Sequence, residues 1–520
     1  MSLFQLTAYG FACAAFYYLC PMRFRWIILL LFSYGFYASK AAACLPFILI
    51  TTLSTWAGAL VIGGIAEKSK ARLKADKATL SKEEKAQIKA AAKSRQRVLF
   101  YAVLVLNFAI LAVLKYTDDV RGLFGASPLG LLLPLGISFY TFQSMGYLID
   151  VYNGKYAPER NPAKFALFVS FFPQLIQGPI ARYDQLGPQL WQGHKLSCDT
   201  LQRSVLLILW GLFKKLVIAD RALPVVNAVF SAPAGELGGA MGVFGVLMYS
   251  LQQYCDFSGG IDLVAGIALQ FGIELAPNFK RPYFATSLGD FWRRWHISLG
   301  GWMRDYVFYP FALTKPMGRL SKAAKARFGA DFGRALPAAI GNILVFVLVG
   351  VWHGATANYV LWGLYNGVIL AFSALMEPAY KRFQTAHARL VATKGFYVLR
   401  VLRTFLIVNI GWYFDRSLRA ADALRMMGAV ATDLRLSQLT ADTLLTLGAT
   451  AADYGLLAVC TVLLFAVSVV QERGVVVSQW VSRRCLPVRW LVLLAGFLSV
   501  LVFGMYGSGF SEAAFIYYQF

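Results

Sequence analysis

Histidine is scarce in this 520-residue chain, and its four histidines stand in different settings. His353 follows a long apolar run, lies between Trp352 and a glycine, and precedes another apolar run. Because a histidine side chain has an ordinary pKa of about 6.5, it can take a proton from a hydroxyl group near neutral pH. The activated hydroxyl can then attack a thioester with no covalent enzyme intermediate. The setting leaves a structural histidine, bonded to a backbone carbonyl, equally open.

A second candidate, His296, lies in a segment rich in tryptophan and arginine at 291–298. If this segment is helical, Trp292 and His296 share a face at i, i+4. An interfacial amphipathic helix with basic headgroup contacts explains the tryptophans and arginines as well, but it does not explain the histidine. The other two, His194 and His387, lie in polar or basic loops and are interpreted as solvated surface residues.

Acidic residues near these histidines are the next candidates. Asp256 and Asp262 belong to a polar cluster at 254–262, between strongly apolar runs. Ionisable groups at membrane depth are costly and commonly face a cavity, so both are expected to face one or to orient a histidine. Structural hydrogen bonding is equally open for both. Asp305 is a further candidate, with a simple pair to Arg304 as the alternative.

Several kinds of chemistry lack the motif that they require. The chain contains no Gly-x-Ser-x-Gly elbow and no Gly-x-x-x-x-Gly-Lys-Ser/Thr phosphate loop, which argues against serine-esterase chemistry and ATP-driven work. Its histidines, cysteines and carboxylates show no metal-ligand spacing, and we expect no metal site. The seven scattered cysteines predict neither a disulfide framework nor a zinc site.

The elements that position these residues must be membrane helices. Hydrophobic residues make up 58% of the chain, charged residues only 15%, and the mean hydropathy is +0.57. A soluble domain is about a quarter charged. The apolar runs, read at about 20 residues per membrane crossing, predict an all-α polytopic protein with roughly 10–12 membrane helices plus re-entrant or interfacial helices. We expect one membrane domain over residues 1–520.

The net charge of +24 is distributed in short loops between apolar runs, which is the positive-inside pattern and not the footprint of nucleic acid binding. Basic segments at 67–97 and 312–334 are therefore placed in the cytoplasm, close to anionic lipid headgroups. Residues 81–84 of the first segment read as a capping box that begins a helix. This topology puts the N-terminus, the segment 415–453 and the C-terminus outside.

At this point the sequence resembles the membrane-bound O-acyltransferases, in particular a bacterial branch that acetylates alginate. The most specific matches are Phe-Trp-Arg-Arg-Trp-His-Ile-Ser-Leu at 291–299, Trp-Met-Arg-Asp-Tyr at 302–306 and Trp-His-Gly-Ala at 352–355. Weaker matches precede and follow them in order, at 33–38, 133–142, 147–152, 172–180, 256–262, 278–283 and 515–520.

The resemblance implies a ring of tilted helices around a central tunnel with a catalytic histidine, His353, deep inside. It implies that His296 positions the acceptor or the donor. We expect substrate contacts from the neighbouring side chains of both motifs and from the acidic cluster: Trp295, Arg293, Arg294, Trp352, Asp256, Asp262 and Asp305. No cofactor is expected to be bound, because the acyl donor, acetyl-CoA or an acyl carrier thioester, is a co-substrate.

The resemblance also implies a setting: the cytoplasmic membrane of a bacterium, a polysaccharide acceptor outside, an acyl carrier, and an accessory secreted or periplasmic partner. Two departures, the residues after Pro310 and the long segment 67–97, put alginate itself and the carrier in doubt. D-alanyl transfer to teichoic acid is the alternative within the family. A transporter of a lipid-linked or small anionic solute and a non-catalytic export scaffold are the alternatives of other classes.

Overall fold

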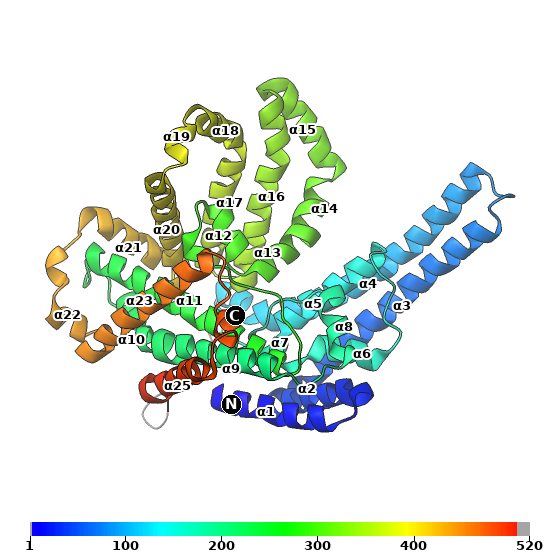
Figure 1. The fold of residues 1–520 in the computed structure, drawn as a ribbon. Helices are drawn as coiled ribbons and strands as arrows, with labels where there is room; N and C mark the ends of the chain where they lie inside the picture. The colour runs from blue at the N-terminus through cyan, green and yellow to red at the C-terminus, as the bar shows by residue number, and fades with distance from the viewer. Residues whose placement is uncertain (1–2, 507–520) are drawn as a thin grey trace. The chain divides into compact units, whose positions relative to one another are not determined.

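The computed structural model describes residues 3–506, and all regular elements in that range are helical (Figure 1). The only strand-like pairing there is a single β-bridge between Phe279 and Trp295. The all-helical class predicted from the sequence is therefore confirmed. The predicted external C-terminus and the last matching segment, 515–520, lie outside the described residues.

The described chain forms two compact units. The first contains Leu3–Leu201 and Ile267–Ala276. The second contains Gln202–Gly266 and the chain from Pro277 onward. The prediction of one membrane domain over residues 1–520 stays a prediction.

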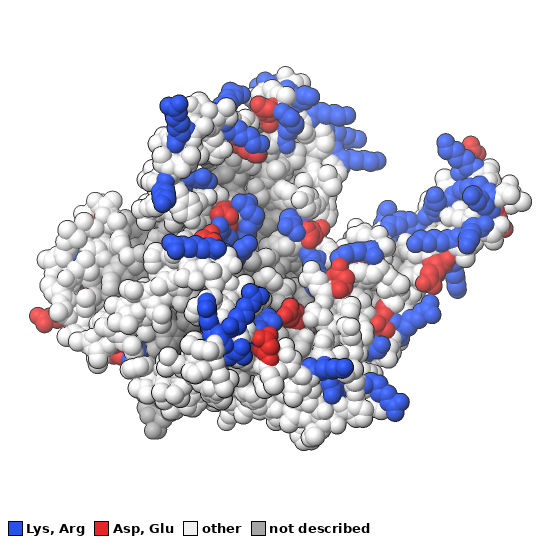
Figure 2. All heavy atoms as spheres, viewed as in Figure 1, with Lys and Arg blue, Asp and Glu red and all other residues white. Residues whose placement is uncertain are grey.

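The helices of the first unit include a long antiparallel hairpin of α3 and α4 whose tip carries many Lys and Arg side chains (Figures 1 and 2). The predicted capping box is confirmed at the start of α4, where Ser81 accepts a hydrogen bond from the Glu84 N–H and Glu84 accepts one from the Ser81 N–H. The elements of this unit are α1 (Leu3–Leu19), η1 (Met22–Phe24), α2 (Arg25–Ala41), η2 (Ala42–Cys44), α3 (Leu45–Ala75), α4 (Lys82–Leu123), α5 (Ile137–Tyr152), α6 (Pro162–Ser170), α7 (Phe172–Gln177) and α8 (Tyr183–Gln192).

The second unit holds both motifs that contain the candidate histidines. After α9 (Cys198–Leu212), which begins in the first unit, its elements are η3 (Phe213–Ala219), α10 (Asp220–Ser231), α11 (Gly239–Gln270), η4 (Pro282–Phe284), α12 (Leu288–Arg294), α13 (Ile297–Met303), η5 (Arg304–Phe308), α14 (Tyr309–Ala312), α15 (Lys315–Phe328), α16 (Ala330–His353), α17 (Ala357–Leu375), α18 (Glu377–Ala386), α19 (Ala388–Val391), α20 (Lys394–Arg416), α21 (Ala420–Thr432), η6 (Leu436–Gln438), α22 (Ala441–Leu445), α23 (Ala451–Glu472), α24 (Val477–Ser482) and α25 (Leu486–Phe503). The segment 415–453, predicted as an external loop, therefore contains three helical elements. Two elements, η3 and η5, are π-helical, a form that is frequent at functional sites.

Seven helical stretches among the described residues are long and apolar enough to cross a membrane. They are Met22–Ala75, Lys82–Gly122, Ala330–His353, Ala357–Leu375, Lys394–Arg416, Ala451–Glu472 and Leu486–Phe503. The first comprises both α2 and α3. In α25 only Val500 is buried, so this helix exposes nearly all of its apolar side chains, as a lipid-facing helix does. The finer count of 10–12 membrane helices stays a prediction.

The helices α16 and α17 pack closely, and this contact positions His353. A Cβ on Gly350 would stand 2.3 Å from the carbonyl oxygen of Tyr359, and one on Gly363 would stand 2.3 Å from that of Phe346. Both positions therefore require glycine, because any larger residue would force the helices apart. The close pair fixes the short turn that follows His353 at the end of α16.

Candidate active site

One cavity of about 620 Å³ in the second unit contains both candidate histidines in its wall. Its lining comes from α12, the turn at 295–296, α13, η5, α14, α16, α17 and α20, with Gln253 from α11. The lining residues of α16 run from Asn342 to His353, which at 1.5 Å per residue is about 16 Å along the helix. The cavity wall therefore follows about three turns of α16.

His353 is the last residue of α16, and only 9% of its surface is exposed. Aromatic rings surround it: Trp352 at 4.9 Å, Trp362 edge-on at 5.2 Å and Tyr359 stacked at 5.9 Å between ring centroids. Such an aromatic cage excludes water from the imidazole and limits its orientation. The structure thus places His353 in a dry, confined position in the cavity wall.

His296 stands between two short helices and not within one. The helix α12 ends at Arg294, and His296 adopts the left-handed conformation, with φ 47° and ψ 53°, as the N-cap of α13. One helix through 291–298 was the condition for Trp292 and His296 to share a face, and the structure does not meet that condition. The cause is the neighbouring segment, whose backbone bonds to 294–297: the Lys280 N–H donates to the Arg294 carbonyl at 2.8 Å, and the Ile297 N–H donates to that of Asn278 at 3.0 Å.

The side chain of Asn278 holds the His296 turn. Its Oδ1 lies 3.3 Å from His296 Nδ1 and accepts hydrogen bonds from both the N–H and the hydroxyl of Ser298, at 3.0 and 2.9 Å. His296 lies outside the seven long apolar helices, and burial lowers its pKa from 6.5 to about 3. The imidazole is therefore neutral near pH 7. Trp352 contacts both rings, His296 at 6.1 Å and His353 at 4.9 Å between centroids.

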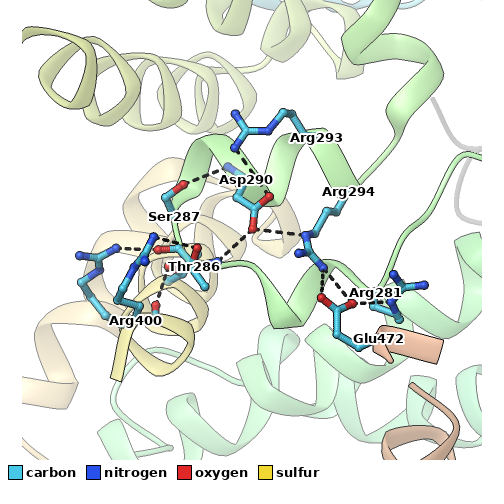
Figure 3. Close-up of polar contacts among 10 residues, drawn as sticks. Arg281, Thr286, Ser287, Asp290, Arg293, Arg294, Arg400 and Glu472 are labelled. Carbon is cyan, nitrogen blue, oxygen red and sulfur yellow. Dashed lines mark hydrogen bonds and ion pairs between the residues drawn. The ribbon is translucent and has the colours of Figure 1, made fainter. Parts of the chain in front are cut away.

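The two arginines of the 291–299 motif have different surroundings (Figure 3). Arg293 is largely exposed, lines the cavity and lies 3.6 Å from Asp290. Arg294 is not among the residues that line the cavity, and it forms ion pairs with Asp290 at 3.2 Å and Glu472 at 2.9 Å (Figure 3). Glu472, at the end of α23, also pairs with Arg281. Arg293 is therefore available to a ligand, whereas Arg294 connects α12 to α23.

The predicted aspartates Asp256 and Asp262 do not line the cavity. Asp256 pairs with Lys215 of η3, which also pairs with Asp220 at 2.9 Å. Asp262 pairs with Lys214 at 2.8 Å. None of the three carboxylates is among the residues that line the cavity. This arrangement fits the structural alternative, in which the carboxylates stabilise the contact of η3 with α11, and their substrate-binding role stays a prediction.

Of the two remaining predicted residues, Trp295 and Asp305, only the first lines the cavity. Trp295 lines the cavity and is buried among Phe279, Phe291 and Trp412. Asp305 pairs with the adjacent Arg304 at 2.9 Å, as its simpler interpretation expected. Arg304 itself lines the cavity, and Asp305 does not.

Sequence reasoning missed two groups of residues. Lys214 and Lys215 are nearly fully buried, and a pair of lysines inside an apolar run was itself a signal that acidic partners must lie nearby. Asp415 is buried, lines the cavity and accepts hydrogen bonds from Tyr249 and Gln253. Its position at the end of an apolar helix led to its interpretation as the start of a loop.

Comparison with known proteins gives the family. Residues 159–410 match the membrane-bound O-acyltransferase family. The chain is 34% identical over 436 residues to a probable alginate O-acetylase of Pseudomonas syringae pv. tomato, covering 81% of this chain and 73% of that protein. It is 32% identical to a peptidoglycan O-acetyltransferase of Helicobacter pylori, over 62% of this chain and 63% of that protein. It is 28% identical to a teichoic acid D-alanyltransferase of Bacillus subtilis, over 55% and 69% respectively.

The chain belongs to the membrane-bound O-acyltransferase family, which confirms the resemblance drawn from its motifs. It is a multi-pass membrane protein and an O-acyltransferase. This assignment favours an enzyme over the transporter and scaffold interpretations. The matched region includes both histidine motifs and most of the cavity wall.

Proposed function

We propose that this protein transfers an acetyl group from a cytoplasmic thioester to hydroxyl groups of a polysaccharide outside a bacterial cytoplasmic membrane. The observation that carries the proposal is the position of His353 and His296 in the wall of one elongated cavity. The relatives named as O-acetylases of alginate and of peptidoglycan support the acetyl group and the polymeric acceptor.

In the proposed reaction, His353 acts as the general base. Its imidazole takes the proton of an acceptor hydroxyl, and the hydroxyl oxygen attacks the thioester carbonyl carbon. The carbon–sulfur bond then breaks, the acyl group remains on the acceptor as an ester, and the thiolate takes the proton from the imidazolium. General-base catalysis of this kind contributes about 10²- to 10⁴-fold to the rate. Neutral His296, whose Nδ1–H faces Asn278 Oδ1, has an unprotonated Nε2 and positions one partner as a hydrogen-bond acceptor.

The distribution of charge supports entry of the donor from the cytoplasm. The basic segment that includes α15 lies at the same end of the second unit as Lys381 and Arg382 of α18, where Arg382 approaches Asp331 of α16 within 3.7 Å. Figure 2 shows Lys and Arg gathered over this end. By the positive-inside rule this end is cytoplasmic, and His353 is at the opposite end of α16.

Arg293 marks the donor end of the cavity. A Cβ on Gly289 would stand 3.7 Å from both Arg293 Nη1 and Leu370 Cδ2, and Leu370 is near the end of α17 that continues into α18. A guanidinium there suits the phosphate groups of acetyl-CoA or of an acyl carrier's phosphopantetheine. The proposal includes such a carrier, and an accessory secreted or periplasmic protein on the acceptor side.

The direct test uses the purified protein in lipid nanodiscs with radiolabelled acetyl-CoA and, separately, an acetylated acyl carrier protein. Alginate, peptidoglycan fragments and cellulose oligosaccharides serve as acceptors. We expect alkali-labile label on at least one polymer, and its loss with His353→Gln, which keeps a polar side chain of similar size but no base. A D-alanylated carrier protein is assayed in parallel, and transfer from it with none from either acetyl donor would refute the proposed acyl group. Label transfer that is equal in both proteins would refute the role of His353.

A further inference from the structure

Asp415 is a carboxylate in the cavity wall that the proposed acyl transfer does not use. It is the penultimate residue of α20 and is only 5% exposed. Among the described residues it forms no ion pair, and the guanidinium of the adjacent Arg416 bonds to Asn227. A buried carboxylate without a cationic partner is costly and needs hydrogen-bond donors around it.

Two side chains of α11 hold this carboxylate by one of its oxygens. The Tyr249 hydroxyl donates to Oδ2 at 2.6 Å, and the Gln253 amide donates to the same atom at 3.0 Å. Both donors are buried, and they lie one helical turn apart. Within the described part of the chain, the other oxygen, Oδ1, accepts no hydrogen bond. Asp415 is thus fixed in place with an acceptor atom left for a ligand in the cavity.

The carboxylate and His353 lie at the same end of the cavity. The Asn358 amide donates to the carbonyl oxygens of Phe414 and Ser417, at 3.3 and 3.1 Å, and so ties the start of α17 to the residues on both sides of Asp415. The next residue, Tyr359, stacks on His353. The basic part of α20 is far away, since Arg400 and Asp415 are separated by about 22 Å along the helix.

We infer that Asp415 forms an acceptor subsite: its Oδ1 accepts a hydrogen bond from a second hydroxyl of the sugar unit whose first hydroxyl faces His353. A ligand carboxylate at this position would meet a buried negative charge, and such like-charge contacts are strongly unfavourable. The cavity therefore selects a neutral, hydroxyl-bearing polysaccharide over a polyuronate. Trp362 and Trp412, whose rings lie nearly parallel with centroids 6.5 Å apart, also line the cavity and add apolar surface to its wall. This inference rests on the proposed function.

A purely structural carboxylate is the competing explanation, because Asp415 also links α20 to α11. The two explanations differ in one measurable quantity. Loss of a structural link weakens the binding of every ligand together, whereas loss of an acceptor subsite changes the preference between neutral and acidic ligands. The substitution Asp415→Asn separates the two explanations. The asparagine amide oxygen can keep the hydrogen bonds from Tyr249 and Gln253, so the link to α11 is retained, while an N–H₂ donor replaces the acceptor that faces the ligand.

The experiment measures binding of cellohexaose and of an alginate hexasaccharide to the full chain in nanodiscs, through quenching of tryptophan fluorescence. We expect wild type to bind cellohexaose at least about tenfold more tightly than the alginate hexasaccharide. Asp415→Asn should weaken cellohexaose binding about tenfold or more and leave alginate binding unchanged or stronger. Asp415→Ser, which removes the charge with a smaller side chain, should abolish the preference even if the asparagine variant folds poorly.

The matched control is Asp422→Asn, which alters a half-buried aspartate of α21 that is paired with Arg425 outside the cavity. It should leave both affinities unchanged. The inference is overturned if wild type prefers the alginate ligand, if it binds neither, or if both Asp415 variants weaken both ligands equally. A preference for cellohexaose that disappears in the variants, together with no acetyl transfer to any polymer, would instead refute the proposed function and leave the subsite standing.

Discussion

Replacing Lys215 by methionine should destabilise the protein strongly, although this lysine is not in the cavity. Its ammonium group lies between two buried carboxylates, those of Asp256 and Asp220. The side chain of Lys215 is 2% exposed, as is that of Asp256, and that of Asp220 is 9% exposed. Methionine fills a similar volume but leaves two buried negative charges without their shared cation.

The expected loss in the free energy of unfolding depends on how many buried charges lose their partner. Removing one member of a buried ion pair costs about 3–5 kcal/mol, because the remaining charge stays desolvated. Asp256→Asn should cost less, about 1–3 kcal/mol, since Lys215 keeps Asp220. The double variant should cost less than the sum of the two by about 0.5–3 kcal/mol, because the two side chains contact each other.

The assay can use the cysteines of the chain. Cys255, next to Asp256, is buried, whereas Cys198 and Cys485 are exposed. A maleimide dye whose fluorescence rises on reaction reports the exposure of buried thiols during heating in detergent. At about 1 °C per kcal/mol for a chain of 520 residues, Lys215→Met should lower the melting temperature by about 3–5 °C. All variants must be compared at one scan rate, because unfolding of such proteins is commonly irreversible.

The reasoning would be refuted if Lys215→Met melts within about 2 °C of wild type. Asp422→Asn disrupts an ion pair at the surface, which contributes little to stability. The reasoning would also fail if this variant lowered the melting temperature as much as Lys215→Met does. Strict additivity of Lys215→Met and Asp256→Asn would show that the two side chains do not interact.

Three further predictions concern other elements. Ser81→Ala removes the capping box of α4 and should cost about 1 kcal/mol, visible as faster hydrogen exchange in the first turn of that helix. Asn278→Ala leaves the Ser298 N–H without its acceptor and should lower stability by about 1–3 kcal/mol, measured as a lower melting temperature. Because burial lowers the pKa of His296 from 6.5 to about 3, the unfolded state binds a proton that the folded state excludes, and stability should fall as the pH falls below 6.5. His296→Gln should flatten that decline, and an unchanged slope would contradict the lowered pKa.

The sequence allowed prediction of the helical class, of the capping box at Ser81 and of the two histidine motifs, because each depends on local pattern or on matching residues. The joint position of His296 and His353 in one cavity followed from the resemblance alone. Nothing local in either motif shows that a cavity joins them. The break in the helix at His296 was not predictable either, since it depends on backbone bonds to Lys280 and Asn278.

Partners distant in the sequence explain the rest. Asp256 and Asp262 were expected near the substrate, but their charges are compensated by Lys215 and Lys214, which belong to a different helical element. The role of Asp415 depends on donors from α11, more than 160 residues earlier in the chain. A charge at the end of an apolar helix is ordinary in a sequence, and only its burial in the cavity wall singles it out.

The central claim is that His353 is the base of an acyl transfer. Its most direct test is the ester content of the cell-surface polysaccharide in cells that carry wild type, His353→Ala or His387→Ala. The third is a matched control, because His387 is exposed and outside the cavity. At equal abundance in the membrane, we expect esters to disappear with His353→Ala and to persist with His387→Ala. Unchanged ester content in the His353→Ala cells would contradict the account.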